Sequence, residues 1–246
     1  MSPTIETAMV LAAGFGKRMR PLTDSLPKPL VEVAGRSLLD RALDRLEEVD
    51  VTRVVVNGHY LANQLYQHLQ ARARPTIRIS DETDAILETG GGVARALPLL
   101  EADVFFVING DSLWLNGAQD ALQRLKNAWN PATMDALLLV HPTHRAHGYD
   151  GKGDFELAPD GRLIRRAEWD VSPYAFMGVQ ILHRRLFEGA PEGAFSLNLL
   201  YNKAEKAGRL KGLLHDGEWF HVGTPKDRDA TEAYLLGEEA SEEEDA

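Results

Sequence analysis

The chain has 246 residues, 44% of them apolar, which is enough to bury a core in one large α/β domain or two small ones. It contains no cysteine, which excludes a disulfide framework and a thiolate metal site. Its formal net charge is −10. Six acidic residues lie within 238–246, so the remainder carries −4 and is a poor partner for nucleic acid. We expect 237–246 to form an acidic, disordered tail.

Neither a membrane span nor a signal peptide is predicted. No segment approaches the roughly 18 consecutive apolar residues that a spanning helix requires. The first residues lack the basic and apolar regions of a secretory signal. Together with the absence of cysteine, these features favour a cytoplasmic protein without a membrane partner.

Strand-like and helix-like segments alternate through about the first 145 residues. Short apolar or β-branched runs predict strands, and apolar residues spaced by three or four predict helices. Strands are expected at 7–13, 53–57, 76–80, 104–109 and 136–140, and helices at 36–48, around Leu61, Leu65 and Leu69, at 92–100 and at 118–129. This alternation predicts an α/β fold, a Rossmann-like, mostly parallel sheet with helices on both faces.

The pattern changes after about residue 145. A Pro-Asp-Gly turn at 159–161 separates expected strands at 154–157 and 162–166. Further strands are expected at 176–182, 210–214 and 218–222, and helices at 197–207 and 225–236. Because no repeat or linker interrupts the chain, we expect 1–236 to form a single domain.

The most informative segment is the loop that follows the first strand. Glycine lets the backbone approach phosphates, free N–H groups point into such a loop, and Arg18 and Lys28 add positive charge. It is not a P-loop, since Gly16-Lys17 is followed by Arg18. It is not a dinucleotide fingerprint, since Met19 stands where a third glycine is required. The candidate nucleotide-binding residues here are Leu11, Ala12, Ala13, Gly14, Gly16 and Lys17.

Two motifs resemble the signature of the sugar-1-phosphate nucleotidyltransferases: Leu-Ala-Ala-Gly-x-Gly-x-Arg-Met-x-Pro-Leu-Thr at 11–23 and Pro-Lys-Pro-Leu at 27–30. The alternative is an ordinary glycine-rich turn. The resemblance implies a nucleotide-diphospho-sugar transferase (GT-A-like) architecture, with the nucleotide in about 1–145 and the sugar in about 146–236. It also implies an enzyme that joins an NTP to a sugar 1-phosphate. Arg18 would hold the β- and γ-phosphates, and Lys28 would bridge the attacking phosphate and the α-phosphate.

A further motif, Val-Ile-Asn-Gly-Asp at 107–111, predicts a metal ligand. An apolar strand ending in Gly-Asp places the Asp111 carboxylate at the edge of the sheet, where it suits Mg²⁺ or caps a turn. The resemblance assigns the catalytic metal to Asp111, with Asn109 as a candidate nucleotide contact. Where the family usually has a second metal-binding aspartate, in Trp-x-Asp-x-Gly-Thr, this chain has His221. Imidazole suits Mg²⁺ less well than carboxylate, so His221 is a candidate ligand for Mg²⁺ or Mn²⁺, a phosphate contact, or a buried histidine.

The run Leu-Glu-Thr-Gly-Gly-Gly at 87–92 predicts a base-binding segment. Glycines before a helix are expected to expose N–H groups and admit a flat base, which makes Gly90 and Gly91 candidates. Glu82 is either an acceptor for the base or a surface acid. The run resembles the branch containing the N-acetylmuramate-1-phosphate uridylyltransferases of peptidoglycan recycling, as do the segments at 151–157, 177–182 and 193–197. The candidate sugar contacts are Asp154, Tyr174 and Gly178.

Three functions remain open at this point. UTP with N-acetylmuramate 1-phosphate is favoured, to give a UDP-sugar, and a mannose-1-phosphate guanylyltransferase is the alternative enzyme. A non-catalytic nucleotide-sugar sensor rests only on His221. The spacing of His141, His144 and His147 permits zinc, but we favour histidines of a loop. The oligomeric state is not indicated.

Overall fold

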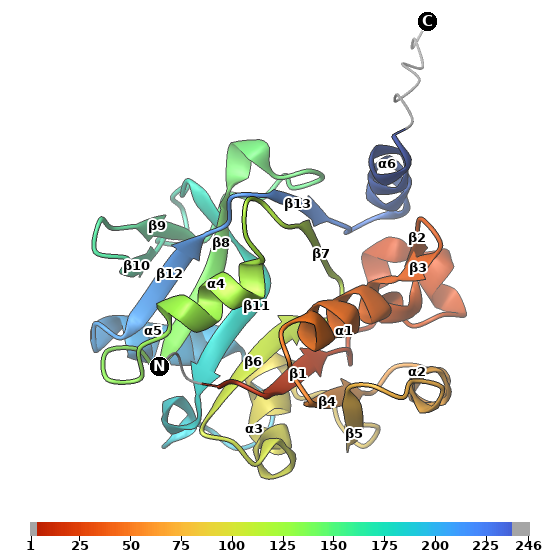
Figure 1. The fold of residues 1–246 in the computed structure, drawn as a ribbon, viewed down its shortest axis with the longest axis horizontal. Helices are drawn as coiled ribbons and strands as arrows, with labels where there is room; N and C mark the ends of the chain where they lie inside the picture. The colour runs from red at the N-terminus through yellow and green to blue at the C-terminus, as the bar shows by residue number, and fades with distance from the viewer. Residues whose placement is uncertain (1–3, 238–246) are drawn as a thin grey trace, which may run out of the picture.

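The β-branched and apolar runs of the first half form the parallel part of a mixed sheet. The computed structural model describes residues 4–237, and in that range the main sheet has nine strands (Figure 1). Four adjacent strands, in the order β6-β1-β4-β5, are parallel: β1 (Thr7–Leu11), β4 (Arg53–Gly58), β5 (Thr76–Asp81) and β6 (Val104–Asn109). Their carboxyl ends therefore meet at one edge of the sheet.

The second half of the chain extends the same sheet. The long strand β11 (Tyr174–His183) runs antiparallel to β6 and joins the two halves. The sheet continues with β8 (Ala136–Pro142), β9 (Phe155–Leu157), β10 (Leu163–Arg165) and β12 (Leu210–Leu214). The strand order is β10-β9-β11-β6-β1-β4-β5, with β8 between β11 and β12. This architecture confirms the predicted α/β class.

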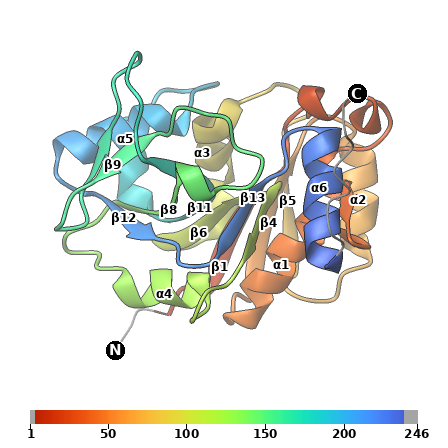
Figure 2. The ribbon, with the colours of Figure 1, turned by 90° about the horizontal axis from the view of Figure 1, so that it is seen from above.

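Helices cover both faces of the sheet, as Figure 2 shows from above. The helices are α1 (Leu38–Glu48), α2 (Ala62–Gln70), α3 (Glu88–Leu100), α4 (Ala121–Ala128), α5 (Leu197–Lys206) and α6 (Pro225–Leu236). Successive side chains of a strand point to opposite faces. Ala8 and Val10 of β1 accordingly pack in a cluster with α1, α2 and α4, whereas Met9 packs in a second cluster with α3 and α5.

Two helices begin two or three residues later than predicted, because capping residues precede them. The helix expected at 36–48 begins at Leu38, because Ser37 accepts the Asp40 N–H and Arg36–Ser37 pairs as β3 with β2 (Glu32–Val33). The helix expected at 118–129 begins at Ala121, because the Asp120 side chain accepts the Gln123 N–H. The first strand ends at Leu11 rather than at 13.

A small second sheet was not predicted as a pair. Its strands are β7 (Ser112–Leu115), which the sequence did not indicate, and β13 (Glu218–His221). They run antiparallel with His221 opposite Ser112. This pairing places His221 opposite the residue that follows Asp111.

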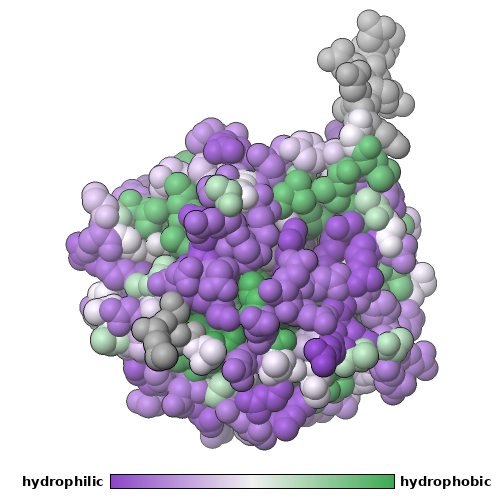
Figure 3. Space-filling view, viewed as in Figure 1, coloured by the Kyte–Doolittle hydropathy of each residue, from purple (hydrophilic) through white to green (hydrophobic). Residues whose placement is uncertain are grey.

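The described surface is mostly hydrophilic on the face shown in Figure 3. A hydrophobic area lies beside α6, on which Tyr234 and Leu236 are 47% and 57% exposed. No helix within residues 4–237 is long and apolar enough to cross a membrane. The tail expected at 237–246 lies, beyond Gly237, outside the described residues.

Candidate active site

A cavity of about 430 Å³ lies at the carboxyl ends of the parallel strands, where an α/β sheet of this kind binds its ligands. We call it the first cavity. Many of the candidate residues named from the sequence line it: Leu11, Ala12, Ala13, Gly14, Gly16, Lys17, Arg18, Lys28, Glu82, Asn109 and Asp111. They come from four separate segments of the chain, so the fold gathers into one place what the sequence contains as separate motifs.

The loop after β1 is shaped by a glycine and by a buried methionine. Gly16 has a φ of 60°, and a Cβ there would lie 2.8 Å from Cβ of Lys28. Its carbonyl accepts the Met19 N–H at 2.9 Å and the Thr23 hydroxyl at 2.8 Å. Met19 is fully buried in a cluster with Phe220. The residue that replaces the third glycine of a dinucleotide fingerprint therefore anchors the loop against β13.

Lys28 and Asp111 form an ion pair at the edge of the sheet. Lys28 begins the short helix η3 (Lys28–Leu30), and its Nζ lies 2.7 Å from Oδ2 of Asp111. Asp111 follows β6, and the Gly110 N–H donates to the Leu11 carbonyl at 2.8 Å, which ties the end of β6 to the end of β1. Burial opposes ionisation of Asp111, but the charge and hydrogen bond of Lys28 outweigh it and lower the pKa. The carboxylate is therefore ionised at neutral pH.

His221, the last residue of β13, lies beside Arg18 but does not itself line the first cavity. Its Nε2 lies 3.5 Å from Nη1 of Arg18. Because a guanidinium only donates, Nε2 can accept this hydrogen bond only when the imidazole is neutral. Burial lowers the pKa of His221, and the charges of Arg18 and Lys28 lower it further. The negative charge of Asp111 acts in the opposite direction and raises the pKa of His221.

The donor set fits a hard divalent cation only in part. Asp111 supplies an ionised carboxylate, of which Lys28 occupies one oxygen. Among residues 4–237, no group of three or more His, Cys, Asp and Glu is arranged to hold a metal ion. Mg²⁺ is commonly held by one or two carboxylates together with substrate phosphates. Asp111 fits that mode, with phosphates completing the coordination.

A buried pair that the sequence analysis missed supports the start of the loop. Asn57 is 1% exposed, and its Oδ1 accepts the Ala12 N–H at 2.7 Å while its Nδ2 donates to Oε1 of Glu82 at 2.8 Å. Glu82 is 1% exposed, so its interpretation as a surface acid is wrong. Burial raises its pKa, and the hydrogen bond from Asn57 opposes that shift. The signal was present in the sequence: Asn57 is a polar residue at the end of a run of three valines.

The triple glycine has a different role from the expected one. Gly90 and Gly91 do not precede the helix but lie in the first turn of α3, and both are buried. Their N–H groups donate to the Phe195 carbonyl at 2.8 and 3.1 Å, so they are not free to bind a base. A Cβ on Gly91 would lie 2.2 Å from the Gly193 carbonyl oxygen. These glycines allow α3 to pack closely against the segment before α5, and Leu87–Thr89 line the first cavity in their place.

A second cavity of about 240 Å³ shares Thr89 and Asn109 with the first. Of the three candidate sugar contacts, Asp154 lines it. Tyr174 is half-buried and packs beside the core cluster of α3 and α5. Gly178 has a φ of 76°, and a Cβ there would lie 2.4 Å from Ser112 Oγ, which explains the glycine by packing. Residues that the sequence analysis did not single out also line this cavity, among them Arg165, Ser196, Asn198 and Tyr201.

The three spaced histidines do not form a site. His141 belongs to β8 rather than to a loop, is fully buried, and lies within hydrogen-bond distance of the carbonyls of Pro142 and Gly217. His144 lies in a short helical turn, η4 (Thr143–Arg145), and His147 pairs with Glu218 at 2.8 Å. The prediction of loop histidines is therefore wrong for His141, because the strand continues to Pro142.

The fold and the first cavity define a nucleotidyltransferase. The chain belongs to the MobA-like NTP transferase family, whose domain model matches residues 8–216.

It is similar to the N-acetylmuramate alpha-1-phosphate uridylyltransferase of Caulobacter vibrioides, with 42% identity over 96% of this chain and 99% of that protein. The N-acetylmuramate alpha-1-phosphate uridylyltransferase of Neisseria meningitidis serogroup B is 36% identical over 88% of this chain and 93% of that protein. Among solved structures, UDP-glucose pyrophosphorylase complexed with UDP-glucose has the same fold, with a TM-score of 0.78, 16% identity, and coverage of 95% of this chain and 100% of that chain.

Proposed function

We propose that the protein transfers the uridylyl group of UTP to N-acetylmuramate 1-phosphate, forming a UDP-sugar and pyrophosphate. The observation that carries this proposal is the Lys28–Asp111 pair, which lies in a cavity that a phosphate-binding loop lines and that a second cavity adjoins. Similarity over nearly the whole length to two proteins with that activity supports the choice of substrates.

The reaction needs no general base, because a sugar phosphate is already anionic at neutral pH. An oxygen of that phosphate forms a bond to the α-phosphorus of UTP. The bond from the α-phosphorus to the oxygen that bridges to the β-phosphate breaks, and pyrophosphate leaves with the electron pair. Two anions must therefore be held together, and positioning and charge neutralisation account for most of the catalysis.

The chain's own residues divide this task. The N–H groups of the loop and the Arg18 guanidinium hold the β- and γ-phosphates. The Lys28 ammonium would bridge the attacking phosphate and the α-phosphate. Asp111 would hold Mg²⁺, which, when bound, neutralises phosphate charge and polarises the α-phosphate. The neutral His221 lies beside Arg18 and is available to a metal ion or to its bound water. We also propose that the enzyme acts in the cytoplasm, where UTP is available.

A matrix assay tests the proposal. Pyrophosphate release is measured for UTP, GTP, CTP and ATP against N-acetylmuramate, N-acetylglucosamine, glucose and mannose 1-phosphates, with Mg²⁺ and with Mn²⁺. We expect the highest kcat/KM for UTP with N-acetylmuramate 1-phosphate. A preference for GTP with mannose 1-phosphate would favour a guanylyltransferase instead. Binding of a nucleotide sugar without turnover of any pair would favour a sensor.

A further inference from the structure

The second cavity contains a cationic side chain that the proposed reaction does not use. Arg165 ends β10 and, with Leu163, belongs to the side of the hairpin that packs toward α5. It lines the cavity together with Asp154, just before β9, and Asn198, near the start of α5. Because the cavity shares Thr89 and Asn109 with the first cavity, a ligand in it lies beside the site of phosphate transfer.

The guanidinium of Arg165 is held in place but not neutralised. Its Nη1 donates to Oδ1 of Asn202, a neutral amide, at 2.6 Å. The backbone N–H of Arg165 donates to Oε1 of Glu205 at 3.4 Å, but within residues 4–237 the guanidinium makes no ion pair. Other arginines of this half do: Arg162 pairs with Asp160 at 2.7 Å, and Arg185 pairs with Asp135 at 2.5 Å. A guanidinium stays charged and offers a planar fork of donors that suits a carboxylate or phosphate. The side chain is thus positioned for an anionic ligand.

The chemistry of the substrate indicates which anion this is. The phosphate must lie between Lys28 and the α-phosphate, so it is already assigned to the first cavity. N-acetylmuramate carries a second anion, the carboxylate of the lactyl ether on its carbon 3, where N-acetylglucosamine has a hydroxyl. Asp154 cannot receive that carboxylate, because like charges repel. Its Oδ2 already accepts the Phe176 N–H at 2.9 Å, and it suits a sugar hydroxyl.

We propose that Arg165 binds the lactyl carboxylate and thereby selects N-acetylmuramate 1-phosphate over N-acetylglucosamine 1-phosphate. The proposal rests on the proposed function and goes beyond it by naming the group that distinguishes the two sugars. Asn202 is a positioning residue, since it holds the guanidinium without reaching the ligand.

The test compares both sugars in one variant. Arg165→Gln keeps a donor for Asn202 and removes the charge. We expect kcat/KM for N-acetylmuramate 1-phosphate to fall about 10- to 100-fold, the range that loss of a charge-assisted hydrogen-bonded pair produces. N-acetylglucosamine 1-phosphate is measured as a substrate or as a competing inhibitor, and its value should not change. Arg165→Lys should retain part of the selectivity, because it keeps the charge without the planar fork.

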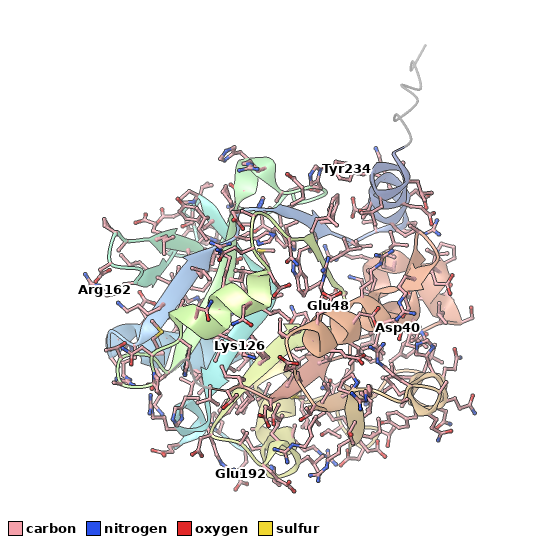
Figure 4. The ribbon with its side chains drawn as sticks, in the orientation of Figure 1. Asp40, Glu48, Lys126, Arg162, Glu192 and Tyr234 are labelled. Carbon is pink, nitrogen blue, oxygen red and sulfur yellow. The ribbon has the colours of Figure 1, made fainter. Side chains whose placement is uncertain are left out.

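A matched control lies on the same hairpin. The Arg162 side chain is 58% exposed, lies at the edge of the molecule (Figure 4), and does not line the second cavity. Arg162→Gln should therefore leave both sugars unaffected. If Arg165→Gln folds poorly, Asn202→Ala provides the second variant, with a smaller loss confined to N-acetylmuramate 1-phosphate.

Equal losses on both sugars, or no loss on either, would overturn the assignment. Failure of the proposed function is distinguished by the wild-type enzyme alone, which would then show no turnover of N-acetylmuramate 1-phosphate. That result would overturn the role of Arg165 as well.

Discussion

The substitution Asn57→Asp tests the buried Asn57–Glu82 pair that supports the loop after β1. The variant keeps the oxygen that accepts the Ala12 N–H but replaces the amide that donates to Glu82 with a second carboxylate oxygen. Two carboxylates then face each other at the 2.8 Å that now separates Nδ2 from Oε1, in a place where both residues are 1% exposed.

The expected loss in the free energy of unfolding is set by the smaller of two energies, the repulsion between the two carboxylates or the protonation of one of them. With an effective dielectric constant of about 20, two like charges at this separation repel by roughly 6 kcal/mol. Protonating one of the two carboxylates at pH 7 costs less. For a glutamate with an ordinary pKa near 4.3, this protonation costs at most about 4 kcal/mol. Burial already raises the pKa of Glu82, so the cost is smaller still. We therefore expect a loss of about 3 kcal/mol in the free energy of unfolding at pH 7.

The sign of the pH dependence is opposite to that of a salt-bridged carboxylate. The native variant holds a proton that the unfolded chain releases, so its stability is present at low pH and falls as pH rises, by about 1.4 kcal/mol per pH unit. Near pH 5 the loss should shrink to about 0.5 kcal/mol. The assay is urea unfolding of variant and wild type from pH 5 to 8.

A second substitution supplies the control. In a Glu82→Gln background the new amide can donate to the introduced carboxylate, so Asn57→Asp should lose its pH dependence there. Parallel stability curves for wild type and the single variant between pH 5 and 8 would refute the reasoning, as would an equal slope in the Glu82→Gln background.

Three further predictions concern the loop and the metal. Lys28→Ala and Asp111→Ala should each lower kcat by about 10²- to 10³-fold with an unchanged circular dichroism spectrum, and near-wild-type turnover in either contradicts its role. Chelation of divalent cations should abolish turnover, and added Mg²⁺ should restore it. The substitution His221→Asp should lower the Mg²⁺ concentration for half-maximal activity. An unchanged Mg²⁺ concentration would place His221 away from the metal. Gly16→Ala should lower the free energy of unfolding by roughly 1–2 kcal/mol, because the φ of Gly16 is positive and a Cβ there would meet Lys28. Gly14→Ala is the control and should have little effect, because a Cβ at Gly14 meets nothing within 4 Å. Similar denaturation midpoints for the two variants would contradict this prediction.

Motifs that are contiguous in the chain could be predicted from the sequence. The loop from Leu11 to Lys17 and the carboxylate of Asp111 each follow a predicted strand, and parallel strands end at one edge of a sheet. Their presence in the first cavity follows from those two facts. Helix and strand periodicity also located most elements, with ends that differ where a cap such as Ser37 decides them.

Contacts between distant segments could not be predicted in this way. The sequence contained His221 in an unexpected place, but only the pairing of β13 with β7 sets it beside Arg18, 203 residues away. Gly90 and Gly91 matched a base-binding pattern, yet the fold places the Phe195 carbonyl against their N–H groups.

The sequence by itself determined the class of chemistry: a glycine loop, two cations and a carboxylate at strand ends, which are local patterns set by backbone geometry and charge. Tertiary structure decided which polar groups are buried and what faces them. Glu82 is a buried partner of Asn57, and the Arg165 guanidinium makes no ion pair within residues 4–237, because burial and pairing depend on residues remote in the chain. Those contacts distinguish a residue that holds the site together, such as Asn57, from one whose charge is left available to a ligand, as proposed for Arg165.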